Sequence, residues 1–167
     1  NNGIMGGKTT TKFDASSSIT RAQLVTTLYR MAGSPATYNN KTLPFTDTTA
    51  LSKEFSNAVK WAYYNKIVGG TTATTFAPNT AVTRQALVKI LYGYATAYDL
   101  DYGTVIGSNL GYYTDGATVS ASMKEAMNWA LDYCLLSGNG AKLNPKGSTT
   151  RGAAAKILAN FHKSFVG

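Results

Sequence analysis

The stretch ITRAQ, residues 19–23, opens a run of apolar residues with helical spacing, and the chain repeats it twice. It returns as VTRQA at 82–86 and as TTRGA at 149–153. Apolar residues three and four positions apart place one apolar face on each following helix. Threonine directly before such a helix is a preferred N-cap, because its hydroxyl accepts a hydrogen bond from a free backbone N–H. The sequence therefore predicts three equivalent helices, each of which begins with arginine.

The similarity between the three copies extends upstream of the arginine. An apolar residue stands eight positions before each arginine, and glycine lies further upstream. Only two copies continue beyond that point: FTD at 45–47 matches YTD at 113–115, and a tryptophan follows each aspartate by fourteen residues. Self-similarity of this length indicates repeated helical units that bury their apolar faces against each other. The shared positions are Phe13, Phe76 and Leu143; Gly6, Gly7, Gly69, Gly70 and Gly138; and Trp61 and Trp129.

The periodicity predicts an all-α fold with no strand longer than a few residues. Five helices are expected, at residues 21–32, 53–66, 84–97, 121–136 and 151–163. They form a single domain, residues 1–167, with repeats at 1–33, 45–97 and 113–163. The first repeat holds only its second half, because no helical pattern precedes Ile4. We expect its unpaired flank to expose apolar surface or to borrow a helix, because Leu24 and Leu28 need a partner.

Composition points to a basic, extracellular protein. The chain carries 16 Lys and Arg against 8 Asp and Glu, a net charge of +8, and basic domains favour anionic partners. The basic residues form no block, which argues against nucleic acid as the partner. Charged residues make up only 14% of the chain, while Thr, Ser, Gly and Asn are abundant, which suggests an extracellular surface. No apolar run is long enough for membrane insertion, and no signal peptide is present.

The chain has few of the residues that catalysis or metal binding needs. Its one histidine, His162, and its one cysteine, Cys134, belong to no cluster with metal-ligand spacing. Cys134 falls within the predicted helix 121–136, where a buried free thiol is the default interpretation. Two carboxylates can hydrolyse a glycoside, but each of the eight acids is explained as a surface or capping residue. We therefore predict no enzyme activity, no catalytic residue, no metal and no cofactor.

The order of motifs resembles the surface-layer homology repeat. Phe-x-Asp, Trp-Ala, Ile-x-Gly-Gly, Phe-x-Pro-Asn and Val-Thr-Arg follow one another across residues 45–95, nearly end to end. Residues 113–161 match with a shortened loop, and residues 3–33 match the second half. The resemblance implies a pseudo-threefold helical domain in which the Thr-Arg helices form a central three-helix bundle and the preceding helices and loops form peripheral prongs.

The same resemblance implies a function and a location. The family anchors exported proteins non-covalently to the bacterial cell wall, so the expected location is extracellular, in the wall or surface layer. Its usual ligand is a secondary cell-wall polysaccharide whose terminal sugar, often N-acetylmannosamine, carries a pyruvate ketal. The ligand lies in grooves between neighbouring repeats. An alternative from a different class is a protein–protein interaction or structural module, with other surface-layer subunits as partners.

The three arginines, Arg21, Arg84 and Arg151, are the first candidates for ligand binding, and the resemblance pairs them with the ketal carboxylate. A guanidinium can donate two parallel hydrogen bonds to a carboxylate, and a helix N-terminus adds N–H donors and partial positive charge. Arginine in the first turn has the wrong sign for the helix dipole, so stability alone would not select it. The alternative is that each arginine bonds loop carbonyls of a neighbouring repeat. The two interpretations are compatible at different copies.

The glycines and tryptophans have two interpretations each. Glycine after a helix is usually a C-cap and turn residue, whereas the resemblance places such loops along the groove. The tryptophans follow the apolar helix faces and belong in the core, with an edge exposed to a sugar ring as the alternative. Asp47 and Asp115 are expected to cap or brace a turn before a helix. The predicted ligand set beyond the arginines is Gly6, Gly7, Gly69, Gly70, Gly138, Trp61 and Trp129.

The helix starts depart from the family pattern. The glutamate that commonly follows Thr-Arg-Ala is replaced by Gln23, Ala86 and Ala153. Gln23 keeps a capping box with Thr20, whereas the other two copies lose it, at a cost on the order of 1 kcal/mol at most. Gly152 weakens the start of the last helix further, so the third groove matches the family least well.

Overall fold

The computed structural model describes residues 4–7, 9–100, 103 and 109–166, and within these residues it is helical with no strand. This confirms the predicted all-α fold. Short 3-10 helices lie at Thr46–Thr48, Asn109–Tyr112, Gly116–Thr118 and Ala121–Met123. The α-helices are α1 (Arg21–Met31), α2 (Lys53–Tyr64), α3 (Arg84–Ala97), α4 (Lys124–Asp132) and α5 (Arg151–Phe165).

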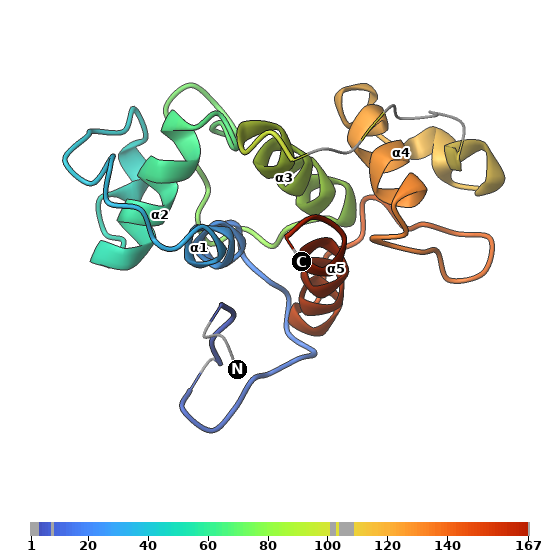
Figure 1. Cartoon of the computed structure of the whole chain (residues 1–167), viewed down its shortest axis with the longest axis horizontal. Helices are drawn as coiled ribbons and strands as arrows, with labels where there is room; N and C mark the ends of the chain where they lie inside the picture. The colour runs from blue at the N-terminus through green and yellow to red at the C-terminus, as the bar shows by residue number, and fades with distance from the viewer. Residues whose placement is uncertain (1–3, 8, 101–102, 104–108, 167) are drawn as a thin grey trace.

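The helices α1, α3 and α5 form the centre of the molecule (Figure 1). The helix α2 flanks the centre on one side, α4 on the other, and the N-terminal loop occupies the third side (Figure 1). A ring of three backbone hydrogen bonds joins the segments that precede the central helices. Ile19 donates to Thr149 O (3.0 Å), Thr149 to Val82 O (2.8 Å) and Val82 to Ile19 O (2.9 Å). Each segment donates once and accepts once, so the centre has an approximate threefold relation.

The central helices begin as the sequence predicts. Thr20, Thr83 and Thr150 are the N-caps, and each hydroxyl accepts from the backbone N–H three residues later. In α1 the amide oxygen of Gln23 also accepts from the backbone N–H of Thr20, which completes the predicted capping box. Such a cap contributes about 1 kcal/mol of stability.

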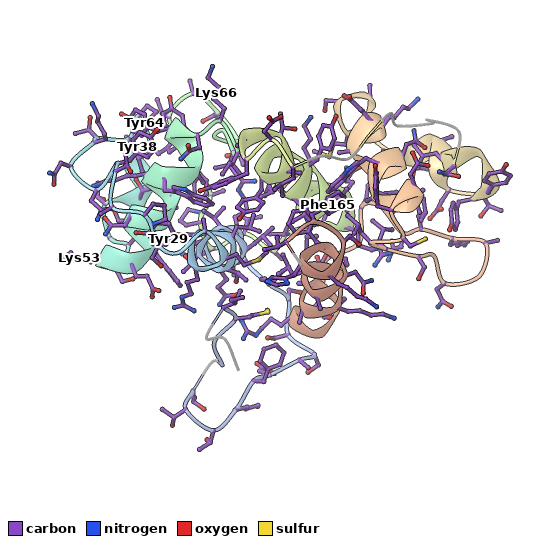
Figure 2. The ribbon with its side chains drawn as sticks, in the orientation of Figure 1. Tyr29, Tyr38, Lys53, Tyr64, Lys66 and Phe165 are labelled. Atoms are coloured by element: carbon purple, nitrogen blue, oxygen red, sulfur yellow. The ribbon has the colours of Figure 1, made fainter. Side chains whose placement is uncertain are left out.

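The peripheral helices are held by tryptophans that insert between central helices. Trp61 and Trp129 are 1% and 0% exposed. Tyr29 of α1 faces α2 (Figure 2), with its ring centroid 5.6 Å from that of Trp61. On the outer side of α2, Tyr38 stacks on Tyr64 at 5.3 Å (Figure 2). The aromatic partners are Tyr29 and Tyr94 for Trp61, and Tyr92 and Phe161 for Trp129.

The predicted ends of two helices are wrong. The helix predicted at 121–136 is a 3-10 turn followed by α4, which ends at Asp132. Cys134 follows with a φ of 53° and is exposed, so the predicted burial of its thiol is also wrong. The reason is a left-handed turn that returns Leu135 to the core, where it is 1% exposed. Lys66, with a φ of 59°, makes the same turn after α2, which ends at Tyr64 instead of Lys66.

The last helix is longer than predicted. It continues past Lys163 to Phe165. The ring of Phe165 stacks on Trp129 at a centroid distance of 5.8 Å. This contact gives the final turn an apolar partner that the local sequence pattern does not reveal.

Candidate functional site

Each of the three predicted arginines holds a loop of another repeat. The Nε and Nη2 groups donate to two backbone carbonyls that lie in equivalent positions of the three loops. These bonds link α1 to the loop before α3, α3 to the loop before α5, and α5 to the loop before α1. They are Arg21 to Phe76 O (2.9 Å) and Gly69 O (3.0 Å); Arg84 to Leu143 O (2.8 Å) and Ser137 O (2.9 Å); and Arg151 to Phe13 O (3.0 Å) and Gly6 O (2.6 Å).

The apolar residue eight positions before an arginine also packs against an arginine. The guanidinium of Arg21 lies over the ring of Phe76 at 4.7 Å, and that of Arg151 over Phe13 at 4.9 Å. Such cation–π contacts contribute about 0.5–1 kcal/mol at exposed sites. The interpretation of the arginines as links between repeats is therefore realised at all three copies, and it explains why arginine occurs at a helix start.

The backbone N–H groups of the first helical turns are not free. Arg84 and Gln85 donate their N–H groups to Gly147 O (3.0 Å) and Pro145 O (2.9 Å). The corresponding residues of α1 and α5 donate to the loops at 78–80 and 15–17. The expectation that these N–H groups serve a ligand is therefore wrong, because the neighbouring loop already accepts from them.

Part of each guanidinium remains available. A guanidinium has five N–H donors, and two serve the loop carbonyls. Among the described residues, no acceptor contacts Nη1 of Arg21, Arg84 or Arg151. Burial lowers the pKa of Arg21 and Arg84, and Asp47 and Asp115 respectively oppose that shift. Arginine stays protonated in proteins, so each guanidinium keeps its charge.

Two aspartates fix the loops that the arginines bind. Asp47 accepts from the backbone N–H groups of Phe76 (2.9 Å) and Ala77 (2.7 Å). Asp115 accepts in the same way from Leu143 and Asn144, both at 2.8 Å. These bonds confirm that the aspartates brace the loops before α3 and α5.

The same bonds change the acidity of the two carboxyls. Burial alone raises the pKa of Asp47, but the N–H bonds and the nearby Arg21 outweigh it, and the net pKa falls below its usual value. The N–H of Leu143 is the largest cause of the lowered pKa of Asp115. Both side chains are therefore acceptors in their ionised form.

The glycines of the predicted ligand set divide into two groups. A Cβ on Gly70 would lie 2.6 Å from the ring of Phe45, and one on Gly138 would lie 2.5 Å from Tyr113. A Cβ on Gly7 would lie 2.6 Å from Thr9 O. These three glycines are required by the packing of their own loops. A Cβ on Gly69 would meet no atom within 4 Å, and one on Gly6 would meet only Arg30 at 3.4 Å, so these two glycines border open space.

A polar cavity of about 560 Å³ lies beside Arg84. Lys142 lines it and brings a second positive charge, while Asp115, also in its wall, uses its oxygens on the loop N–H groups. Sequence reasoning missed Lys142. Its position between Gly138 and the Thr-Arg pair, in a loop with glycine and proline, was the available signal. The remaining lining residues are Ser137, Gly138, Asn139, Leu143 and Asn144.

A smaller cavity of about 260 Å³ lies beside Arg151. It is bordered by Gly6 and Gly7 and by Arg30, whose guanidinium pairs with Glu54 at 2.7 Å. The hydroxyl of Thr26 in its wall is buried and has no hydrogen-bond partner among the described residues. This cavity therefore has one arginine that is already neutralised.

The two predicted tryptophans do not belong to these cavities. Both indoles are buried between helices, as the core interpretation requires, and neither lines the cavity beside Arg84 or Arg151. The alternative of an edge exposed to a sugar does not agree with this burial. Within the described part of the chain there is also no group of three or more His, Cys, Asp or Glu that could hold a metal. No described helix is long and apolar enough to cross a membrane.

The repeated Thr-Arg helices, the braced loops and the grooves between repeats define a helical repeat domain of one known class. The profile of the S-layer homology domain matches residues 44–87 and 112–155, which is more than half of the chain. The chain belongs to the S-layer homology domain family. Domains of this family are non-catalytic modules of the cell surface that anchor proteins to cell-wall polymers.

A curated relative gives the matching context. The chain is 28% identical over 158 residues to an endoglucanase from Bacillus sp. (strain KSM-635). The match covers 93% of this chain and 16% of the endoglucanase. The chain therefore spans about one sixth of the relative's length.

Proposed function

We propose that this chain anchors its protein to the bacterial cell wall by binding an anionic, pyruvylated secondary cell-wall polysaccharide in the grooves between repeats. The groove beside Arg84 is the principal site in this proposal. Its support is the cavity of about 560 Å³ in which Arg84 and Lys142 supply positive charge. The net charge of +8 adds a general attraction to an anionic polymer.

The proposed contact differs from a simple fork on the whole guanidinium. Nε and Nη2 of Arg84 already donate to Leu143 O and Ser137 O. A carboxylate would therefore approach the end formed by Nη1 and the second N–H of Nη2, which can still donate two parallel bonds. In this arrangement Arg84 holds the loop and the ligand at once. Lys142 would contribute as a point charge.

The three grooves are not equivalent in this proposal. Residues 1–33 act as the second half of a first repeat, because Arg151 bonds Phe13 O and Gly6 O as Arg84 bonds its own loop. Asp14, Ala77 and Asn144 share a left-handed backbone with φ of 53–59°, which supports the same loop in all three repeats. The groove beside Arg151 is smaller, and its side chain is only 4% exposed. We rank it below the groove beside Arg84.

Replacement of Lys142 by alanine tests the proposal without disturbing the links between repeats. Lys142 contributes only backbone groups to the loop, through bonds with Asn139. In cosedimentation with purified walls, Lys142→Ala should weaken binding several-fold while the melting temperature stays unchanged. Lys41→Ala, on an exposed loop far along the chain, is the matched control and should bind as the unchanged chain does. Equal binding by Lys142→Ala and Lys41→Ala would refute this groove as the site. Binding that depends on wall proteins instead of the polymer would favour the interaction-module alternative.

A further inference from the structure

The threefold relation of the centre defines three equivalent positions for a peripheral helix. The helix α2 covers the position between α1 and α3, where Trp61 contacts both helices. The helix α4 covers the position between α3 and α5, where Trp129 contacts both. The third position lies between α5 and α1, and among the described residues no helix covers it.

An apolar cavity of about 430 Å³ lies at this third position. Leu158 and Ala159 of α5 and Met31 of α1 line it, together with Ile4. Ala159 is eight residues after Arg151, which is the position of Tyr29 and Tyr92 relative to their arginines. Met31 likewise takes the position of Tyr94 and Phe161. The cavity therefore coincides with the place that a tryptophan occupies at the other two positions.

A second observation indicates the same missing cover. Phe76 is fully buried, and Phe45 from the first half of its repeat packs on it at 5.7 Å. Phe13 is the equivalent residue of the first repeat and is 38% exposed. The difference is expected if the segment equivalent to Phe45 and α2 is absent from the surroundings of Phe13.

We infer that this cavity receives an amphipathic helix supplied by the residues directly upstream of Asn1 in the same polypeptide. The register favours this source. Both α2 and α4 end three residues before the apolar residue that returns to the core, Ile67 or Leu135. Ile4 is the equivalent residue and lines the cavity, so a helix in the same register would end at position 1. The match to about one sixth of a longer relative agrees with a chain that has further residues.

The proposed helix has a defined chemistry. In α2 and α4 the buried face carries alanine, an apolar residue and Trp-Ala, as in Ala58, Val59, Trp61 and Ala62. Small residues let the helix approach, and the indole fills the space between two central helices. The occupant should therefore present a tryptophan toward Ala159 and Met31.

A graft tests this inference. Residues 52–66, which contain the N-cap Ser52 and α2, are placed directly before Ile4 in place of residues 1–3. The graft should raise the melting temperature by roughly 5 °C or more and reduce binding of the dye ANS, which reports exposed apolar surface. Ala159 is exposed in the ungrafted chain, so Ala159→Glu should leave that chain folded and remove the gain from the grafted one. Ala97→Glu, at another exposed helical alanine, should leave the gain intact.

Three outcomes would overturn the inference. The first is a grafted chain with an unchanged melting temperature. The second is a gain that survives Ala159→Glu. The third is an ungrafted chain that is dimeric by sedimentation and becomes monomeric with Ala159→Glu, which would assign the cavity to a second copy. None of these readouts uses wall binding, so the result is independent of the proposed polysaccharide.

Discussion

Replacement of Arg84 by alanine removes the link between α3 and the loop of the next repeat. Two hydrogen bonds are lost, to Leu143 O and Ser137 O. Hydrogen bonds to charged groups contribute about 1.5–3 kcal/mol each, and the lower end suits a half-buried side chain, so the loss is about 3 kcal/mol. Removal of a cation from a helix N-terminus offsets about 0.3–1 kcal/mol of this. The net destabilisation of about 2–3 kcal/mol corresponds to a fall in melting temperature of roughly 5–10 °C.

Thermal unfolding followed by far-ultraviolet circular dichroism measures this fall. Lys53→Ala is the matched control, because Lys53 also occupies the first position of a helix but is exposed and makes no described hydrogen bond to a loop. It should change the melting temperature by less than about 2 °C. Arg84→Lys should recover only part of the loss, because an ammonium lacks the planar pair of donors. A melting temperature for Arg84→Ala equal to that of Lys53→Ala would refute the link between repeats.

The loop braces, the exposed thiol and the helix caps give three further predictions. The lowered pKa values of Asp47 and Asp115 mean that their stabilisation is present above the ordinary carboxyl pKa of about 4 and is lost as the pH falls through the folded-state pKa. Denaturant titrations between pH 7 and pH 3 should thus show stability falling in acid, and a slope unchanged by Asp115→Asn would contradict the brace. Cys134 is exposed, so Ellman's reagent should label it rapidly in the native protein, whereas labelling only after unfolding would contradict the left-handed turn. Thr83→Ala should cost about 1 kcal/mol through loss of the N-cap, and an unchanged urea midpoint would contradict it.

The sequence predicts the helix starts well because their determinants are local. Thr20, Thr83 and Thr150 stand beside the N–H groups that they cap, and Gln23 lies within reach of the same turn. The apolar spacing likewise identifies the buried faces, including those that carry Trp61 and Trp129.

The helix ends are harder, because the apolar pattern continues where the backbone turns. Leu135 and Leu136 extend the spacing of α4, yet the chain has already left the helix at Asp132. The turn uses Cys134 at positive φ, which is uncommon for a residue other than glycine. No local feature of the sequence marks that conformation.

The role of the arginines depends on acceptors that the sequence does not encode in side chains. Arg84 bonds backbone carbonyls more than fifty residues away, and any residue type supplies a carbonyl. Spacing alone therefore leaves a link and a ligand contact as open alternatives. The distinction between Gly69 and Gly70 is equally remote, because it depends on how closely the ring of Phe45 approaches.

The most direct test of the proposed function compares two wall preparations that differ in one chemical group. Walls are isolated and stripped of surface proteins, and one half is treated with mild acid to remove the pyruvate ketal. At moderate salt, where exposed charges are screened beyond about 8 Å, the chain should cosediment with the untreated walls and stay in solution with the treated ones. Equal binding to both preparations would contradict recognition of an acidic ketal in the grooves.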